Sequence, residues 1–373
     1  MSENWSSVLR IVAKAAIFFV LLNLAFAVFY PLDLLGSISL YNWILTGRER
    51  LPYGENPEDS YNLSLNNLPA MAASHTLSQD KGEDEFRVVI VGDSGTWGWL
   101  LENEHTLASQ INQAGLLTND GRQVVAYNFA YPIMSITKDI VLLETALELD
   151  LDLIIWPVTL QSFDRDSQLD HPLLQENSDR VRSLIEQFGL ELDPDDERFE
   201  DPDLMDRTIV GQRRELADLM RLQLYGFSWS ATGIDQASPE EITLRATDFE
   251  EDISWLDIPE PIPLTSNELS WDVLAAGVTM TGDVPVLIVN EPIFISDGTN
   301  SDLRYNAWYP RWAYDSYRKQ LTEFAENGEW HYLDLWDRID LDNFTDSPVH
   351  LDSAGSALFG SLLVEYIEEL VGQ

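Results

Sequence analysis

A serine directly follows a short, strongly apolar stretch in the first third of the chain. Residues 87–91 read Arg-Val-Val-Ile-Val, and Gly92-Asp93-Ser94-Gly95 comes next. A β-branched run of this kind predicts a buried parallel strand, and the turn at its end lies where α/β sheets bind ligands. A serine hydroxyl becomes a useful nucleophile when a base removes its proton and N–H groups hold the oxyanion. Ser94 is therefore the candidate nucleophile, with Asp93 and Gly95 as possible substrate contacts; the alternative is a serine that only caps the next helix.

The other two parts of a Ser-His-Asp relay stand near the C-terminus. His350 lies in a loop, residues 344–355, that enters the last predicted helix, and Asp346 precedes it by four positions. Such a loop can bring an imidazole to the sheet edge that carries Ser94, where Asp346 would orient the ring and stabilise its protonated form. We take His350 as the candidate base and Asp346 as the candidate relay carboxylate. The alternative is a histidine that only caps the helix or lies on the surface.

Charge and composition exclude several other classes of function. The 373 residues carry a formal net charge of −42 at pH 7, whereas nucleic-acid binding needs a basic surface. The chain has no cysteine, so disulfides, thiolate metal ligands and cysteine nucleophiles are excluded. The five histidines are spread out and show no H-E-x-x-H spacing, so we expect no metal centre and no cofactor.

The N-terminal residues 11–30 are almost wholly apolar, which predicts a helix long enough to span a membrane. Residues 1–35 are therefore expected to form a transmembrane anchor, with the N-terminus in the cytoplasm and the body outside it. The rival interpretation is a cleaved signal peptide, because Ala25-Phe26-Ala27 resembles a peptidase site. Residues 36–84 then have the character of a stalk, and a folded domain is expected over residues 85–373.

Short apolar runs separated by helical patterns predict a parallel sheet that is covered on both faces. After the run at 87–91, the expected strands are residues 124–129, 153–156, 286–289 and 332–335. The expected helices between and after them are residues 105–113, 136–149, 314–324 and 354–370. An acidic stretch, residues 164–280, interrupts this alternation after the third strand and holds further helical patterns. We expect it to be a mostly helical insertion that hangs over the active edge as a lid or recognition subdomain.

The pairing of Val-Gly-Asp-Ser at residues 91–94 with Asp-x-x-x-His-Leu at residues 346–351 resembles the SGNH, or GDSL-type, hydrolase superfamily. The resemblance covers roughly residues 86–165 and 280–373. It implies a flavodoxin-like three-layer fold and a Ser-His-Asp relay that cleaves or transfers O-acyl groups. The layout of an anchor and an outer body is similar to relatives that add or remove acyl groups on cell-surface glycans. The family's aspartate stands three residues before its histidine, where this chain has Ser347.

The same resemblance implies which groups would hold the oxyanion. The family's second block has a glycine whose backbone N–H serves this role, and Ala130 stands at that position. Its third block has an asparagine that corresponds to Gln161, whose amide can donate in the same way. The implied donors are therefore Ser94, Ala130 and Gln161, with Thr159 nearby as a possible substrate contact.

Other polar and aromatic residues fall at the same predicted edge of the sheet. Asn290 ends the fourth expected strand and is a possible substrate contact. Aromatic side chains could stack on sugar rings there, although such residues more often belong to the core. The candidates for this aromatic wall are Trp97, Trp99, Trp308, Tyr309 and Trp312.

The leading hypothesis is a serine-dependent hydrolase of O-acyl esters, of acetyl type, that acts outside the cytoplasm on an ester or glycan substrate. An O-acyltransferase that modifies a surface polysaccharide would use the same relay, with a glycan hydroxyl in place of water. The second alternative is a catalytically degenerate fold that binds an envelope polymer or a partner protein.

Overall fold

Five parallel strands form one sheet in the computed structural model, which describes residues 2–54, 63–232 and 242–371. Their order across the sheet is β2-β1-β3-β4-β5, and neighbouring strands pair in parallel. This is the flavodoxin-like order, so the α/β fold predicted from the sequence is confirmed. The strands are β1 (Glu85–Ile90), β2 (Gln123–Asn128), β3 (Leu153–Val158), β4 (Val286–Asn290) and β5 (His331–Asp334).

Helices connect the strands and cover both faces of the sheet. The segments predicted from their periodicity form α6 (Leu107–Gln113), α7 (Ile136–Ala146), α12 (Arg311–Gly328) and α13 (Ser353–Val371). A further helix, α11 (Trp271–Met280), leads into β4. The remaining helices are α1 (Ser2–Phe29), α2 (Leu32–Gly36), α3 (Leu40–Ile44), α4 (Leu68–Ser74), α5 (Ser94–Trp97), α8 (Pro172–Gln175), α9 (Ser178–Phe188) and α10 (Arg213–Thr232).

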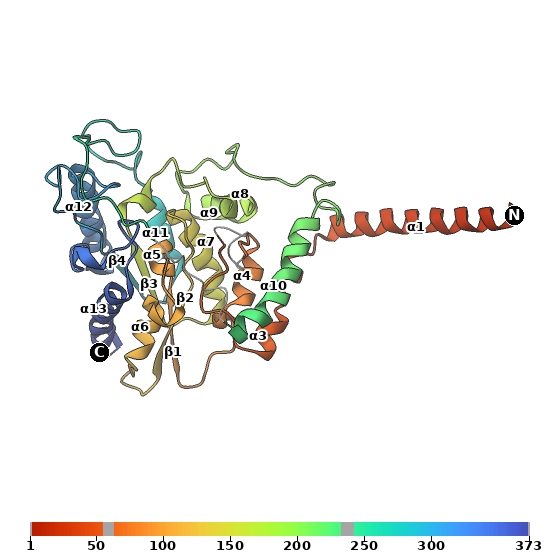
Figure 1. Ribbon diagram of the computed structural model, residues 1–373, viewed down its shortest axis with the longest axis horizontal. Helices are drawn as coiled ribbons and strands as arrows, with labels where there is room; N and C mark the ends of the chain where they lie inside the picture. Colours follow the sequence, from red (N-terminus) through yellow and green to blue (C-terminus); the bar gives the residue numbers. More distant parts are fainter. Residues whose placement is uncertain (1, 55–62, 233–241, 372–373) are drawn as a thin grey trace.

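Two hydrophobic cores lie on opposite faces of the sheet because side chains alternate along each strand. In β1, Val89 belongs to the first core, whereas Val88 and Ile90 belong to the second. In β3, Ile154 and Ile155 divide in the same way. α7 and α11 pack together over the first core, and α6 and α13 pack together over the second (Figure 1). The sheet is therefore the central layer of three.

Residues 36–84, which we expected to form a stalk, pack into the first core where the structure describes them. Tyr41, Leu51 and Met71 are all completely buried in that core. The Tyr41 hydroxyl donates to the carbonyl of Ser74 over 2.9 Å, which holds α3 against the end of α4. The apolar residues of this segment follow neither a helical nor a strand period, so a periodicity argument could not detect their burial.

The same segment supports the short helix that follows β1. Arg50 Nη1 donates to the carbonyls of Gly98 and Leu101 at 3.0 and 3.1 Å. Its guanidinium lies over the Trp97 ring, 4.3 Å from the ring centroid. The Trp97 indole N–H in turn donates to the carbonyl of Leu51 over 3.0 Å. The chain between α1 and β1 therefore braces α5 directly.

α1 projects away from the body for most of its length (Figure 1). Its residues Trp5–Phe29 have a mean hydropathy of 2.4 and are long enough to cross a bilayer. The inner end is attached to the body. There, Asn23 Oδ1 accepts from the Val210 N–H and the Tyr30 hydroxyl accepts from Gln212 Nε2, both at 3.2 Å. By length and composition, such a helix fits a membrane anchor or a signal sequence.

The long interruption at residues 164–280 holds α8, α9 and α10, joined by irregular stretches, and its last ten residues form α11, the helix that leads into β4. α10 packs against α2, α3 and α4, at the flank of the body that carries α1 (Figure 1). A later stretch of the interruption reaches the loop that carries His350, where the Arg245 N–H donates to the Thr345 carbonyl over 3.1 Å. The interruption thus contributes both to the α1 flank and to the active edge.

Candidate active site

Ser94 is the first residue of α5, immediately beyond the end of β1. Asp93 caps this helix, because its carboxylate accepts from the Gly95 N–H over 2.8 Å. Gly92 adopts a φ of +155°, and a Cβ there would lie 2.7 Å from Thr96 Oγ1. Glycine is therefore required for the turn that lifts Ser94 to the edge of the sheet. The position lies between β1 and its neighbour β3, which is the ligand-binding point of this topology.

The loop before α13 brings His350 and Asp346 to the same edge. The loop is closed by the Thr345 N–H, which donates to the His350 carbonyl over 2.9 Å. His350 Nε2 lies 2.8 Å from Ser94 Oγ, and His350 Nδ1 lies 2.8 Å from Asp346 Oδ1. With the Nδ1 proton donated to the carboxylate, Nε2 accepts from the serine hydroxyl. The three side chains that the sequence singled out thus form one hydrogen-bonded row.

The environment favours an ionised carboxylate at Asp346. Burial is the largest single influence and acts to raise its pKa, but the hydrogen bond and charge of His350 and the hydrogen bond from Thr345 together outweigh burial, and the net pKa lies below the ordinary aspartate value. The Thr345 hydroxyl adds a further hydrogen bond to Asp346 Oδ1 at 3.2 Å. Asp346 therefore carries the charge that a developing imidazolium needs beside it.

The three expected oxyanion donors differ in their surroundings. Ser94 N–H belongs to the first turn of α5, where a helix leaves its amide groups without intrahelical partners. The Ala130 N–H instead donates to Asn128 Oδ1 over 3.3 Å. Gln161 is half-buried, and its backbone N–H donates to the Tyr309 hydroxyl over 3.4 Å. Ala130 would therefore have to exchange its present bond before it could serve an oxyanion.

Two of the expected substrate contacts have side chains that are buried and hydrogen-bonded within the protein. The hydroxyl of Thr159 is bonded to the hydroxyl of Tyr309 over 3.0 Å, and Thr159 is fully buried. Asn290 is also fully buried; its amide donates to Asp334 and its oxygen accepts from two tyrosine hydroxyls. Both residues therefore stabilise the ends of β3 and β4 instead of facing a ligand. Gly95 remains at the half-buried rim beside Ser94.

A buried ionic network that the sequence did not indicate lies beneath the Ser94 turn. Lys138 is fully buried, and its ammonium donates to the carbonyls of Gly92 (2.5 Å) and Tyr131 (3.0 Å) and to the carboxylate of Asp139. Burial raises the pKa of Asp139, and the Lys138 charge opposes that rise. Lysine is rarely buried, so nothing in the sequence marks Lys138 as the residue that ties the Ser94 turn to the loop after β2.

A second part of this network is a pair of carboxyl groups. Asp93 and Glu291 are both buried, and their carboxyl groups lie close together beside Gly95. Burial, and then the charge of Asp93, raises the pKa of Glu291 well above its ordinary value. Two carboxylates in this position cannot both ionise easily, so the site favours the protonated form of Glu291. Asp93 thus braces the turn that carries Ser94.

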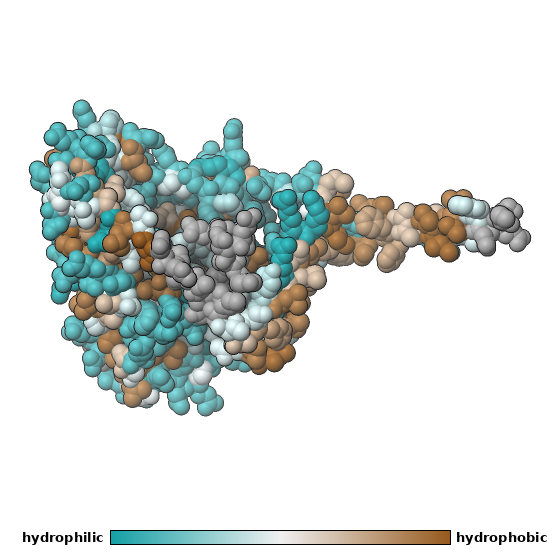
Figure 2. All heavy atoms as spheres, viewed as in Figure 1, coloured by the Kyte–Doolittle hydropathy of each residue, from teal (hydrophilic) through white to brown (hydrophobic). Residues whose placement is uncertain are grey.

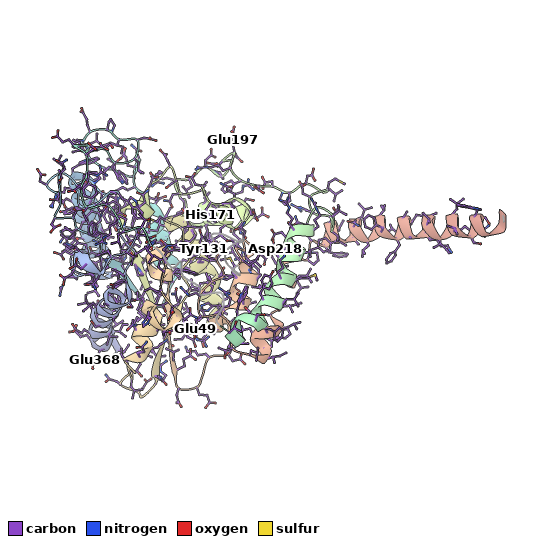
Figure 3. All side chains as sticks on the ribbon, in the orientation of Figure 1. Glu49, Tyr131, His171, Glu197, Asp218 and Glu368 are labelled. Atoms are coloured by element: carbon purple, nitrogen blue, oxygen red, sulfur yellow. The ribbon has the colours of Figure 1, made fainter. Side chains whose placement is uncertain are left out.

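The aromatic residues divide into a wall at the site and a core beneath it. The half-buried Trp99 stacks on the His350 ring, with centroids 5.8 Å apart. Tyr53 meets Trp99 edge-on at 6.1 Å and Tyr131 at 5.3 Å. Tyr131 in turn contacts His171, and Figure 3 labels this pair between α7 and α8. The other candidates behave as core or as partly buried side chains: Trp97 and Tyr309 are buried, and Trp308 and Trp312 are half-buried.

One group of side chains has the composition of metal ligands. Among the residues that the structure describes, Glu102, Glu104 and His105 bring their ligand atoms within 4.8 Å of one another, on the loop before α6. The two carboxylates are exposed to solvent. Exposed acids of this kind are common on so acidic a chain, so the group does not by itself define a metal site.

The solved structures to which this chain is similar share little sequence with it. No family model matches the sequence, and no curated protein matches it. The aryl esterase of M. smegmatis is 12% identical with a TM-score of 0.35, over 76% of this chain and 99% of that one. A carbohydrate acetylesterase family member from Sinorhizobium meliloti is 13% identical with a TM-score of 0.33, over 77% and 99%. A protein of the G-D-S-L family from Desulfitobacterium hafniense DCB-2 is 10% identical with a TM-score of 0.35, over 75% and 98%. At these values, the function has to be argued from the site itself.

Proposed function

We propose that this chain is a serine esterase of SGNH type that hydrolyses O-acyl esters. The observation that supports the proposal is the row of two 2.8 Å hydrogen bonds from Ser94 through His350 to Asp346. A hydroxyl bonded to an imidazole that is itself oriented by a carboxylate is the arrangement that makes serine nucleophilic.

The geometry leads to a two-step reaction. Ser94 Oγ attacks the ester carbonyl carbon while His350 Nε2 takes the hydroxyl proton, and the carbonyl electron pair moves onto oxygen. The oxyanion is held by the Ser94 N–H and the Gln161 amide. Collapse expels the alkoxide, which takes the proton from His350 and leaves an acyl-serine. Water then attacks the acyl group with His350 as base, which releases the acid and restores Ser94.

The finer substrate assignment is an acetyl-type ester on a glycan. The half-buried ring of Trp99 beside His350 supports it, because a flat aromatic face suits both sugar rings and aryl groups. Release of acetate from acetylated oligosaccharides would support hydrolysis. Appearance of newly acetylated oligosaccharide, when an acyl donor and a glycan acceptor are mixed with the protein, would identify a transferase instead.

We also propose that α1 is a retained anchor and that the body lies outside the cytoplasm. Cleavage after Ala27 would remove the bond between Asn23 and Val210 together with the buried side chain of Ala27, and the new chain end would begin with the exposed apolar residues Val28 and Phe29. Retention predicts that the full-length protein stays in the membrane fraction after an alkaline carbonate wash and that its N-terminal sequence begins before Ala27.

The esterase proposal is tested by Ser94→Ala in the full-length protein. Hydrolysis of p-nitrophenyl acetate should fall by at least about 10³-fold, and labelling by a fluorophosphonate probe should be lost. Ser347→Ala is the matched control because this serine lies on the same loop as His350 and outside the hydrogen-bonded row. A wild-type protein that neither reacts with the probe nor hydrolyses the ester would point to a degenerate binding protein.

A further inference from the structure

The body has an exposed apolar surface on the flank where α1 is attached. Two segments that are far apart in the sequence form it: α10 lies beside α3 in Figure 1, and it also packs against α2. Trp43 is 69% exposed and Ile44 is 72% exposed, which is unusual for large apolar side chains of a folded domain. We call this surface the flank face; its residues are Leu34, Ile38, Leu40, Trp43, Ile44, Met220, Leu224 and Phe227.

α10 supplies an amphipathic helix to the flank face. Met220, Leu224 and Phe227 are exposed and follow one another at intervals of four and three residues, so they form one stripe along the helix. The opposite side of the helix is buried against the body through Leu219, Leu222, Gly226 and Trp229. The helix therefore has two apolar sides, and the body covers one of them.

Close packing fixes this helix in place. A Cβ at Gly226 would lie 2.2 Å from the Tyr41 ring, so only glycine allows α10 to lie this near to α3. The side chain of Gln223 donates to the carbonyl of Ile38 and accepts from the N–H of Leu40, at 2.9 and 2.7 Å. The two halves of the flank face are therefore one rigid surface.

The inner end of α1 is tied to the same unit. Val210 and Gln212, just before α10, hold Asn23 and Tyr30 through the hydrogen bonds described above. The Arg207 guanidinium also lies over the Tyr30 ring, 5.3 Å from its centroid. As a result, the direction of α1 and the orientation of the flank face are set together.

The position and charge of the flank face indicate that it contacts a lipid surface. Figure 2 shows brown apolar surface running from α1 onto the adjacent flank, which is the side that a bilayer crossed by α1 would meet. Residues 207–232 carry four arginines and two acidic residues, in a chain whose net charge is −42. Asp218, labelled on α10 in Figure 3, pairs with Arg221 at 2.6 Å. The flank is thus apolar and less acidic than the chain as a whole, as a surface that meets lipid headgroups requires.

We propose that the flank face lies in the headgroup layer of the membrane that α1 crosses, with Trp43 and the Met220–Leu224–Phe227 stripe inserted beside the anchor. Burial of each large side chain adds favourable free energy, and tryptophan prefers the interface. The proposal rests on α1 being a retained anchor. It adds that the body is held against the bilayer in one orientation and does not swing on a tether.

The absence of cysteine in the chain allows a direct test with single labels. Full-length Leu224→Cys, carrying a bimane fluorophore, is reconstituted in vesicles of phosphatidylcholine and phosphatidylglycerol that contain nitroxide-labelled lipid. We expect the lipid nitroxide to quench this label severalfold more than iodide does. Leu358→Cys on α13 is the matched control, since Leu358 is also an exposed leucine and α13 lies far from α1 (Figure 1). Its label should respond to iodide and not to the lipid quencher.

A third labelled variant tests the membrane anchor independently of the flank face. Leu21 is an exposed residue within α1, so Leu21→Cys reports whether the helix enters the bilayer at all. Quenching by lipid at 21 but not at 224 would overturn the flank proposal and leave the anchor intact. No lipid quenching at either position would overturn both. If 224 is shielded from both quenchers and shows energy transfer between differently labelled copies, the flank face pairs with a second chain and the membrane proposal is wrong.

Discussion

The substitution Asp346→Asn tests whether the relay uses the residue four positions before His350. The side chains are almost the same size, so the change removes the negative charge with little effect on packing. An asparagine amide can donate to Nδ1 of His350, which leaves the ring proton on Nε2. In that tautomer, Nε2 cannot accept the proton of Ser94.

The expected loss follows from the distance and from the exposure of the pair. Taking the 2.8 Å separation of His350 Nδ1 and Asp346 Oδ1, the attraction between unit charges is about 1.5 kcal/mol at the dielectric constant of water and about 6 kcal/mol at an effective value of ~20. The Asp346 side chain is 31% exposed, so an intermediate value applies. At about 1.4 kcal/mol for each tenfold change, we expect kcat/KM to fall by about 10²- to 10⁴-fold.

The assay is hydrolysis of p-nitrophenyl acetate by the full-length protein in detergent, compared with Ser347→Ala. Ser347 stands three positions before His350, and its hydroxyl accepts from the Val349 N–H at 3.3 Å. We expect the alanine variant to retain activity within about threefold of wild type. Equal rates for wild type and Asp346→Asn, or a larger loss in Ser347→Ala, would refute the assignment of Asp346.

Two further predictions concern the turn that carries Ser94. In Gly95→Ala, the new Cβ would lie 2.8 Å from the Val349 carbonyl, so the loop with His350 must move and the rate should fall by about 10²-fold. Gly82→Ala, whose Cβ meets its nearest neighbour at 3.5 Å, should be silent in the same ester assay, and equal rates for the two variants would contradict the reasoning. The third variant, Glu291→Gln, tests the raised pKa of Glu291 in the folded protein. The native state binds a proton that the unfolded chain loses above about pH 4.3. The free energy of unfolding of the wild type therefore falls as pH rises toward the folded pKa, by up to about 1.4 kcal/mol per pH unit. Glutamine does not titrate, so the Tm of the variant relative to wild type should rise with pH between roughly 5 and 8, the range below a strongly raised pKa. A difference in Tm that does not change with pH would show that Glu291 is ionised.

The sheet and its covering helices were predictable because their signals are local. Apolar runs and helical periods mark β1 to β5 and the main crossovers, and parallel strands place their ends at one edge. The same rule predicted that Ser94 and His350 lie close together, because Ser94 follows β1 and His350 precedes α13 at that edge. The packing of residues 36–84 was missed because their apolar side chains have no period.

The rest of the site depends on contacts that no local pattern reveals. Thr159 and Asn290 stand at the correct edge, but the sequence cannot tell that their side chains turn inward to tyrosine hydroxyls. The burial of Lys138 under the nucleophile turn could not be foreseen for the same reason. The end of a strand places the backbone of a residue at the sheet edge, but only three-dimensional packing determines which way its side chain points.

The bonds from Arg50 and the Leu51 carbonyl to the residues around Trp97 have a practical consequence. A truncated version that begins at Phe86 would lose Arg50 and Leu51, whose hydrogen bonds support the helix that starts with Ser94. Its loss of activity would say nothing about the need for lipid. A shortened chain suited to crystallisation should therefore begin ahead of α3, so that the segment that supports α5 and Ser94 is retained.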